Sequence, residues 1–184
     1  MLSSKCVVKV LGLILAIGST SCLTALAQPD HAEAAKVSEA LIKTRLAEAR
    51  ALLEQGKDEA AEARLGQDST RRAKSVEGFQ EKAADFLRIA FSAKEAGDIQ
   101  TAQKAAKHAL VQLENAEKVA TNDNSLAEIS EFRGVIFERL LGDTTQAVRE
   151  YKKALERKPD ASSARQKLRR IDTEASAKSP EASK

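Results

Sequence analysis

One phrase occurs twice in this chain of 184 residues, and it constrains the fold more than any other feature of the sequence. The phrase is a Gly-Asp pair, a small residue four positions after the aspartate, and a closing Ala-Leu pair. The two copies begin at Gly97 and Gly142. A glycine turn that precedes a stripe of small residues and recurs along a chain is typical of stacked helical hairpins, which usually hold partners and rarely catalyse reactions.

The composition supports an all-α fold. Hydrophobic residues make up 42% of the chain but aromatic residues only 3%, and there are only three prolines. Ala, Leu, Glu, Lys, Arg and Gln dominate, and these residues have the highest helix propensities. No segment shows the alternating β-branched residues that are typical of a β-strand. We therefore expect one all-α domain.

The spacing of the apolar residues predicts a series of helices joined by short turns. We expect each glycine of the repeated phrase to end a helix in the left-handed conformation and the aspartate after it, Asp98 or Asp143, to cap the next helix. Asp68 or Ser69, and later Asp160, are expected to cap the helices that follow them. The expected helices span approximately 32–55, 58–65, 70–96, 98–119, 126–141, 144–158 and 161–175.

Around the second copy the sequence reads Gly142-Asp143-x-x-x-Ala147-x-x-x-Tyr151-x-x-Ala154-Leu155-x-x-x-Pro159. This string resembles the second half of a tetratricopeptide repeat, which has Gly-Asp at the interhelix turn, then a small residue, an aromatic residue, Ala-Leu and a closing proline. The unit around Gly97 is similar to the family in its first helix, through Phe86, Ile89 and Ala90. It differs at Ala106, where an aromatic residue is usual. Gly134 resembles the small residue at the helix crossing, but it lies one residue too far from Gly142.

The resemblance implies an all-α stack of about three antiparallel helical hairpins with a C-terminal capping helix, over residues 28–175. It is weakest over residues 37–72. The residues implied in packing within and between the repeats are Phe86, Gly97, Ala102, Ala109, Gly142, Ala147, Tyr151, Ala154 and Pro159. The alternative is a plain antiparallel helical bundle with glycine turns. Residues 176–184 are small, polar and charged, so we expect a disordered tail there.

Residues 1–27 have the pattern of a secretory signal peptide. Lys5 and Lys9 precede an uncharged apolar run, and Ala25-Leu26-Ala27 places small residues before a cleavage site ahead of Gln28. Two alternatives remain. Cys22 could be lipidated, although Ser19 stands where a bacterial lipobox has a large aliphatic residue, or the segment could be an uncleaved anchor. We expect export, with a periplasmic or secreted location, and membrane attachment only under one of these alternatives.

The rest of the chain contains no recognisable catalytic machinery. The only two cysteines of the sequence, Cys6 and Cys22, lie within the expected signal peptide. After cleavage, therefore, no disulfide, thiolate nucleophile or thiolate metal ligand is expected. We expect His108 to be an exposed helical histidine without metal-ligand neighbours. Without Lys5 and Lys9, 28 of the 30 basic residues remain and nearly balance the 27 acidic ones, which gives no electrostatic argument for nucleic-acid binding. We expect no cofactor, no metal and no enzymatic activity.

The expected function is non-enzymatic protein binding, as a scaffold or adaptor of a bacterial cell envelope. The resemblance implies that first helices line a concave face, and the candidate partner-binding residues on them are Leu87, Arg88, Phe91, Lys94 and Arg133. Phe91 is the expected aromatic anchor, unless it belongs to the core with Phe86. The partner would be another protein or a peptide. The alternatives are a structural or oligomeric helical bundle without a groove and a lipid-anchored assembly factor.

Overall fold

The computed structural model describes residues 31–66 and 74–177. Contacts divide the chain into two compact units, 1–36 and 37–184, and the account below concerns the second unit. The predicted signal peptide and the predicted cap at Asp68 or Ser69 lie outside the described residues, and so does the predicted tail, 176–184, apart from its first two residues. Ser176 and Ala177 are helical, so they are not part of a disordered tail. None of the described helices combines the length and the hydropathy needed to cross a membrane.

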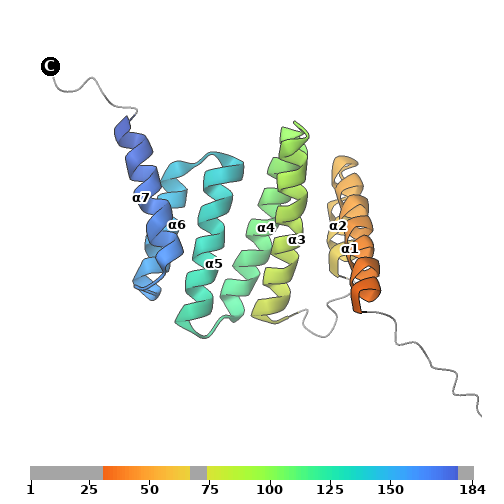
Figure 1. Ribbon diagram of the computed structural model, residues 1–184, viewed down its shortest axis with the longest axis horizontal. Helices are drawn as coiled ribbons and strands as arrows, with labels where there is room; N and C mark the ends of the chain where they lie inside the picture. The colour runs from red at the N-terminus through yellow and green to blue at the C-terminus, as the bar shows by residue number, and fades with distance from the viewer. Residues whose placement is uncertain (1–30, 67–73, 178–184) are drawn as a thin grey trace, which may run out of the picture. The chain divides into compact units, whose positions relative to one another are not determined.

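The expectation of an all-α fold is confirmed, and no β-strand occurs in the described ranges (Figure 1). The elements in chain order are α1 (His31–Glu54), α2 (Asp58–Gly66), α3 (Val76–Glu95), α4 (Ile99–Val119), α5 (Asp123–Ile136), the π-helix η1 (Phe137–Leu141), α6 (Thr144–Arg157) and α7 (Ser162–Ala177).

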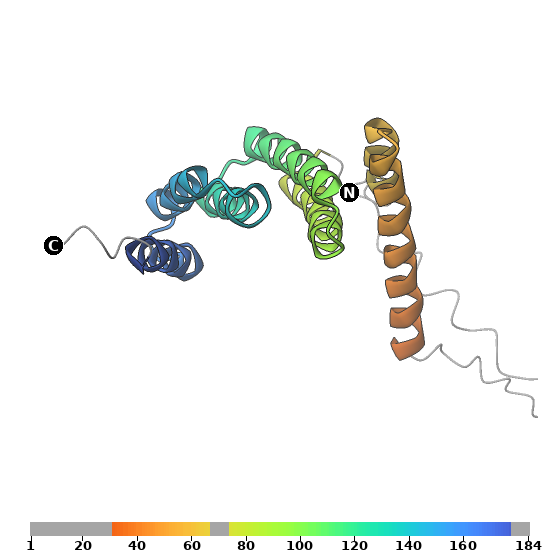
Figure 2. The same cartoon turned by 90° about the horizontal axis from the view of Figure 1, so that it is seen from above.

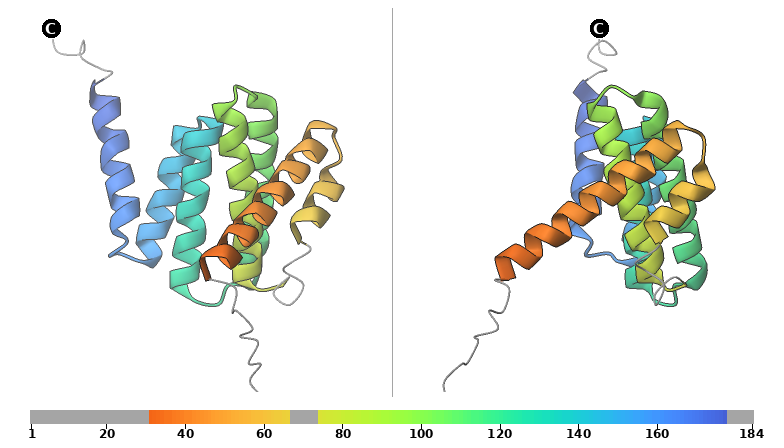
Figure 3. Two further views of the ribbon diagram at one scale, coloured as in Figure 1. Left: turned by 45° about the vertical axis from the view of Figure 1, so that its right-hand side comes forward. Right: turned by 90° about the vertical axis from the view of Figure 1, so that its right-hand side faces the viewer.

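The helices form a stack of three antiparallel hairpins followed by one capping helix. The hairpins are α1–α2, α3–α4 and α5–α6, and α7 packs against α6 (Figure 3). Seen from above, α4 and α6 lie in one row while α3, α5 and α7 lie in the other (Figure 2). Alternate helices of the α3–α7 segment therefore share a face of the stack.

Each hairpin turns at a glycine in the left-handed region, where a residue with a Cβ is strained. The φ angles are +76° at Gly56, +80° at Gly97 and +70° at Gly142. The aspartate after each of the last two glycines caps the next helix as predicted. Asp98 accepts a hydrogen bond from the Thr101 backbone N–H at 3.0 Å, and Asp143 accepts one from Gln146 at 2.9 Å.

Three predicted helix starts were wrong, because local polar groups begin the helices elsewhere. α3 begins at Val76 and not near residue 70, since the Ser75 hydroxyl accepts a hydrogen bond from the Gly78 N–H. α5 begins at Asp123, since the Asn122 side chain caps it. Asp160 does not cap α7. It lies with Pro159 in a turn closed by a hydrogen bond from the Ala161 N–H to the Lys158 carbonyl, and α7 begins at Ser162.

The core contains two clusters of buried side chains. The larger joins the first two hairpins to α5 and η1, and the smaller joins α6 to α7. The structure buries the residues that the resemblance placed at helix crossings, each at 2% exposure or less: Phe86, Ala102, Ala109, Ala147, Tyr151 and Ala154. Alanines along α4 and α6 let the facing helices approach closely, which explains how a chain with so few aromatic residues fills its interior.

The C-terminal end of the α5 segment is a π-helix over Phe137–Leu141. A π-turn holds one residue more than an α-turn, and this surplus accounts for the extra residue between Gly134 and Gly142. Gly134 still lies directly against the ring of Tyr151. A Cβ built on Gly134 would lie 2.4 Å from Cε1 of that ring, so the ring occupies the space of the missing side chain.

Two acidic residues of the third hairpin hold the capping helix. Glu131 of α5 interacts with Lys167 and Ser163 of α7. Glu138 of η1 interacts with Arg170 of α7 and also accepts a hydrogen bond from the Tyr151 hydroxyl at 2.7 Å. Apart from Ala164 and Ile171, the side chains of α7 are exposed or half-buried. A mostly polar last helix is what ends a stack of this kind.

Candidate functional site

The five predicted partner-binding residues do not form one groove. Leu87 is only 8% exposed and belongs to the larger core cluster, which corrects its assignment to a binding surface. Arg133 is also occupied within the fold. Its Nη1 lies 2.7 Å from Oε2 of Glu117 on α4, and Nη2 of Arg157 on α6 lies 3.7 Å from the other oxygen of the same carboxylate. Arg133 therefore joins the second hairpin to the third.

Phe91 and Lys94 both interact with the π-helix and not with a common groove. Phe91 is half-buried and packs against the core. The guanidinium of Arg139 lies over its ring, 5.0 Å from the centroid, an attractive cation–π arrangement. Lys94 donates a hydrogen bond to the Arg139 carbonyl. The structure thus agrees with the alternative expectation, that Phe91 is part of the packing, and corrects its assignment as an exposed anchor.

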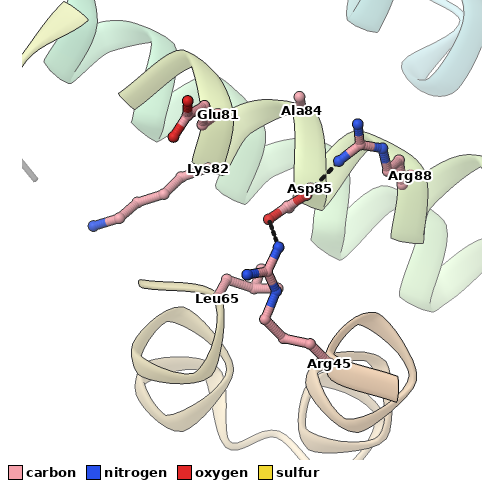
Figure 4. Close-up of a pocket in the computed structure, with 7 residues that line it drawn as sticks. All are labelled: Arg45, Leu65, Glu81, Lys82, Ala84, Asp85 and Arg88. Atoms are coloured by element: carbon pink, nitrogen blue, oxygen red, sulfur yellow. Dashed lines mark hydrogen bonds and ion pairs between the residues drawn. The ribbon is translucent and has the colours of Figure 1, made fainter. Parts of the chain in front are cut away.

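Arg88 alone of the five lies at an open groove, between α1 and α3. Two cavities of about 200 and 270 Å³ share this residue, and we call them together the α1–α3 groove. The first is lined by Arg45, Leu65, Glu81, Lys82, Ala84 and Asp85 (Figure 4). The second is lined by Lys43, Leu46, Ala47, Arg50, Ile89 and Ser92.

A buried carboxylate organises the middle of this groove. Asp85 is 6% exposed and accepts hydrogen bonds from Arg45 of α1 at 3.1 Å and from Arg88, one turn further along α3, at 2.5 Å (Figure 4). The Arg45 side chain is 15% exposed, whereas that of Arg88 is 60% exposed. Asp85 therefore ties α1 to α3 through one arginine and positions the other at the groove surface.

A second charged cluster holds the first hairpin to the second. His108 of α4 lies between two carboxylates of α2, with Nε2 3.3 Å from Asp58 and Nδ1 3.0 Å from Glu62. Its ring stacks on Phe86, with centroids 5.1 Å apart. Lys104 lies 2.6 Å from Asp58, and this hydrogen bond, which outweighs the opposing effect of burial, holds the pKa of that carboxyl below its usual value.

The expectation that His108 is an exposed helical histidine was wrong. Its side chain is 18% exposed, because the hairpin turn brings α2 against α4. Its partners lie about 50 residues earlier in the chain, so no local spacing pointed to them. Within residues 31–66 and 74–177, no group of three His, Cys, Asp or Glu side chains is arranged to hold a metal ion. The cluster has the geometry of a docking contact between hairpins.

Another cavity, of about 280 Å³, lies between α5 and α7. Phe132, which is 43% exposed, forms its wall with Val135, and the charged residues around it are Glu128, Glu131 and Lys167. Phe132 was not among the site residues selected from the sequence, and the structure leaves its side chain at the surface. Two of its three charged residues are acidic, whereas the charged residues of the second cavity of the α1–α3 groove are Lys43, Arg50 and Arg88.

Comparison of the chain with protein-family models, with curated proteins and with solved structures gives no match to any of them.

Proposed function

We propose that the chain is a non-enzymatic protein-binding scaffold or adaptor of the tetratricopeptide type, and that it holds a segment of a protein partner in the α1–α3 groove. The observation that carries this proposal is the open groove between the first helices of two stacked hairpins. Buried Asp85 positions an exposed guanidinium there. Stacked hairpins offer extended surfaces of this kind to partners.

The size of the groove supports a macromolecular partner over a small molecule. Cofactors and metabolites usually occupy sites of roughly 300–1,000 Å³ that enclose most of their surface. Each of the two cavities, of about 200 and 270 Å³, is smaller than such a site. They suit one or two side chains of a peptide segment whose remainder lies along the helices.

We also propose that the protein is exported to the cell envelope, on the strength of the sequence pattern in residues 1–27. The intact mass of the protein recovered from its native cells tests this. A mature chain that begins at Gln28 is expected. A diacylglyceryl mass on Cys22 would replace the proposal with the lipid-anchored alternative, and retention of residues 1–27 would contradict cleavage.

A photo-crosslinking amino acid introduced in the groove tests the binding function. We place it at Ser92, an exposed residue of the groove, and at Gln103, an exposed residue of α4, as the matched control. In native cells, the Ser92 position is expected to capture one defined protein that the Gln103 position does not. That protein, once purified, is expected to bind the full chain directly.

Two charge reversals connect the captured protein to the groove. Arg88→Glu is expected to weaken its binding by about tenfold or more, as befits a central contact. Lys107→Glu makes the same change of charge on the exposed surface of α4 and is expected to leave binding unchanged. Equal crosslinking from both positions, or crosslinking only to a second copy of this chain, would replace the proposal with a structural or oligomeric bundle.

A further inference from the structure

Among the described residues, those that line the larger cavity of the α1–α3 groove include three cations and no acidic residue. Its charged residues are Lys43 and Arg50 from α1 and Arg88 from α3. Lys43 and Arg50 are seven positions apart, which places them two turns apart on one face of α1, with Arg88 across the groove. A cavity that is lined by charges of one sign and has low-dielectric protein walls concentrates positive potential in the space that it encloses.

The acidic partners of these cations lie outside the cavity. Lys43 pairs with Glu39 at 2.8 Å, and both side chains are mostly exposed. Arg50, which is 27% exposed, pairs with Glu54 at 2.9 Å and lies 3.9 Å from Asp98, and each of these carboxylates is at least about one-third exposed. Exposed pairs of this kind contribute little to stability, typically 0–1 kcal/mol. A carboxylate that enters the cavity can therefore replace these acidic residues as the ion-pair partner of Lys43 or Arg50 with little loss of stability.

Arg88 differs from the other two cations because its position is determined by a buried group. Asp85 engages one nitrogen of its guanidinium, whereas a guanidinium offers five N–H donors in a planar fork. The side chain nevertheless remains 60% exposed. Such a group binds a carboxylate in the bidentate manner with less loss of rotamer freedom than an unrestrained arginine.

The floor of the same cavity is apolar. Leu46 and Ala47 of α1 and Ile89 of α3 form it. Ala47 is exposed, Leu46 is half-buried and Ile89 is 2% exposed. A cavity of about 270 Å³ above this floor accepts one side chain of medium size, with the cations placed around it.

We propose that the α1–α3 groove recognises an acidic segment of a protein partner, in which an apolar side chain is flanked by carboxylates. This inference rests on the proposed function and specifies its ligand. The apolar side chain lies on Leu46, Ala47 and Ile89. One flanking carboxylate binds Arg88, and the other lies against Lys43 or Arg50. The cavity between α5 and α7 carries Glu128 and Glu131 with one cation, Lys167, so it is a less favourable site for the same acidic segment.

Selection from a displayed library of random heptapeptides tests the inference. The full chain is the target, and the selected peptides are expected to be enriched in Asp and Glu on both sides of an apolar residue. Binding of a synthetic peptide of the enriched sequence is expected to weaken steeply as salt is raised. Its analogue with Asn and Gln at the acidic positions is expected to bind at least about tenfold more weakly.

Three variants of the full chain locate the binding. Arg88→Glu and Ala47→Glu are each expected to lower the affinity for the enriched peptide by about tenfold or more. The first replaces a cation of the groove, and the second places a charge on its apolar floor. Ala47→Glu leaves the Arg45–Asp85–Arg88 contacts untouched, so it remains informative if Arg88→Glu fails to fold. Lys107→Glu is the control of equal charge change and is expected to bind like the parent.

Two results overturn the inference. One is a set of selected peptides without acidic enrichment, or no enrichment at all. The other is binding of the acidic peptide that neither groove variant reduces. Neither result touches the proposed function, which depends on the protein that the Ser92 crosslinker captures. Conversely, acidic peptides that bind through Arg88 support the groove's specificity even where that crosslinker captures nothing.

Discussion

Gly134 and Tyr151 form the tightest contact between the two helices of the third hairpin. A Cβ at position 134 would lie 2.4 to 2.9 Å from three atoms of a fully buried aromatic ring. Gly134→Ala is expected to destabilise the protein by about 1–3 kcal/mol, because the overpacking outweighs the roughly 1 kcal/mol that alanine gains in a helix. Thermal melting measures the effect.

Gly66→Ala is the matched control for this substitution. Among the described residues, the added Cβ would meet the flexible end of Lys82, at 3.4 Å and beyond, so the variant is expected to melt at or slightly above the parent temperature. A Gly134→Ala protein as stable as the parent would mean that the Tyr151 ring can move aside, and that the close contact does not determine the register of the hairpin.

Tyr151 gives the protein a specific sensitivity to alkaline pH. Burial, with a further contribution from the hydrogen bond to Glu138, raises the pKa of this phenol well above its usual value. The unfolded chain ionises its tyrosine at about pH 10 while the folded chain does not. The contribution of the neutral Tyr151 phenol to the free energy of unfolding is therefore fully present below pH 10. Above pH 10 the free energy of unfolding falls by up to about 1.4 kcal/mol per pH unit.

The comparison with Tyr151→Phe isolates this effect, because the chain has no other tyrosine and the lysine background is the same in both proteins. The parent is expected to be more stable by about 1 kcal/mol at neutral pH, and its advantage should shrink above pH 10. Tyrosinate absorbance should rise only as the parent unfolds. Titration of the phenol in the folded protein would contradict the expectation.

At the scale of the elements, Glu117 joins the second hairpin to the third. Its carboxylate lies between Arg133 of α5 and Arg157 of α6. Glu117→Gln is expected to cost about 1 kcal/mol, a value kept small because the carboxylate is one-third exposed. On the same helix, Glu114 has one ion pair within the described part of the chain, with exposed Lys118, so Glu114→Gln should cost less than about 0.5 kcal/mol. Equal melting temperatures for the two variants would exclude a role for Glu117 in stacking.

Local signals explain which elements the sequence predicts well. The Gly-Asp phrases carry their own C-cap and N-cap, so the turns at Gly97 and Gly142 were predicted to the residue. The start of α3 was not, because Ser75 competed with Asp68, Ser69 and other polar residues of the segment after Gly66. The π-helix could not be predicted either. The sequence indicates it only through the one extra residue between Gly134 and Gly142. That residue could be assigned to a π-turn only after the structure showed Tyr151 packed against Gly134.

At the scale of the whole molecule, charged contacts dock the first hairpin on the second. Asp58→Asn removes the carboxylate that Lys104 and His108 share. It is expected to lower the stability by about 1 kcal/mol at neutral pH and to speed amide hydrogen exchange in α1 and α2. The pKa of Asp58 is held below its usual value. The contribution is therefore present above about pH 4 and is lost as the pH falls through the lowered pKa.

Parent and Asp58→Asn should consequently converge in stability at acid pH. Asp172→Asn, on the exposed side of α7, is the control and should match the parent at every pH. If exchange in α1 and α2 were unchanged by Asp58→Asn, apolar packing alone would hold the first hairpin.

The candidate site belongs to this largest scale, which is why the sequence predicted only one of its residues. Arg88 was selected for its place on a first helix. Arg45 and Asp85, which meet at 3.1 Å, are 40 positions apart, and the hairpin containing α1 has the weakest repeat pattern in the chain. Leu87, Phe91, Lys94 and Arg133 were expected in the same groove. Their burial and their contacts with η1 and α4 depend on how the hairpins stack, which periodicity along one helix does not report.

The π-helix also bears on how the length of this chain can change. Loss of one residue from 137–141, for example Leu141, would turn the π-turn into ordinary α-turns and leave Gly134 facing Tyr151. The same loss at Ala84 in α3 would rotate every later side chain of that helix by about 100° relative to its neighbours. We expect the first deletion to preserve cooperative melting and the second to abolish it. Residues 137–141 would then be a position where one residue can be gained or lost during evolution without a change in the packing of the helices on either side.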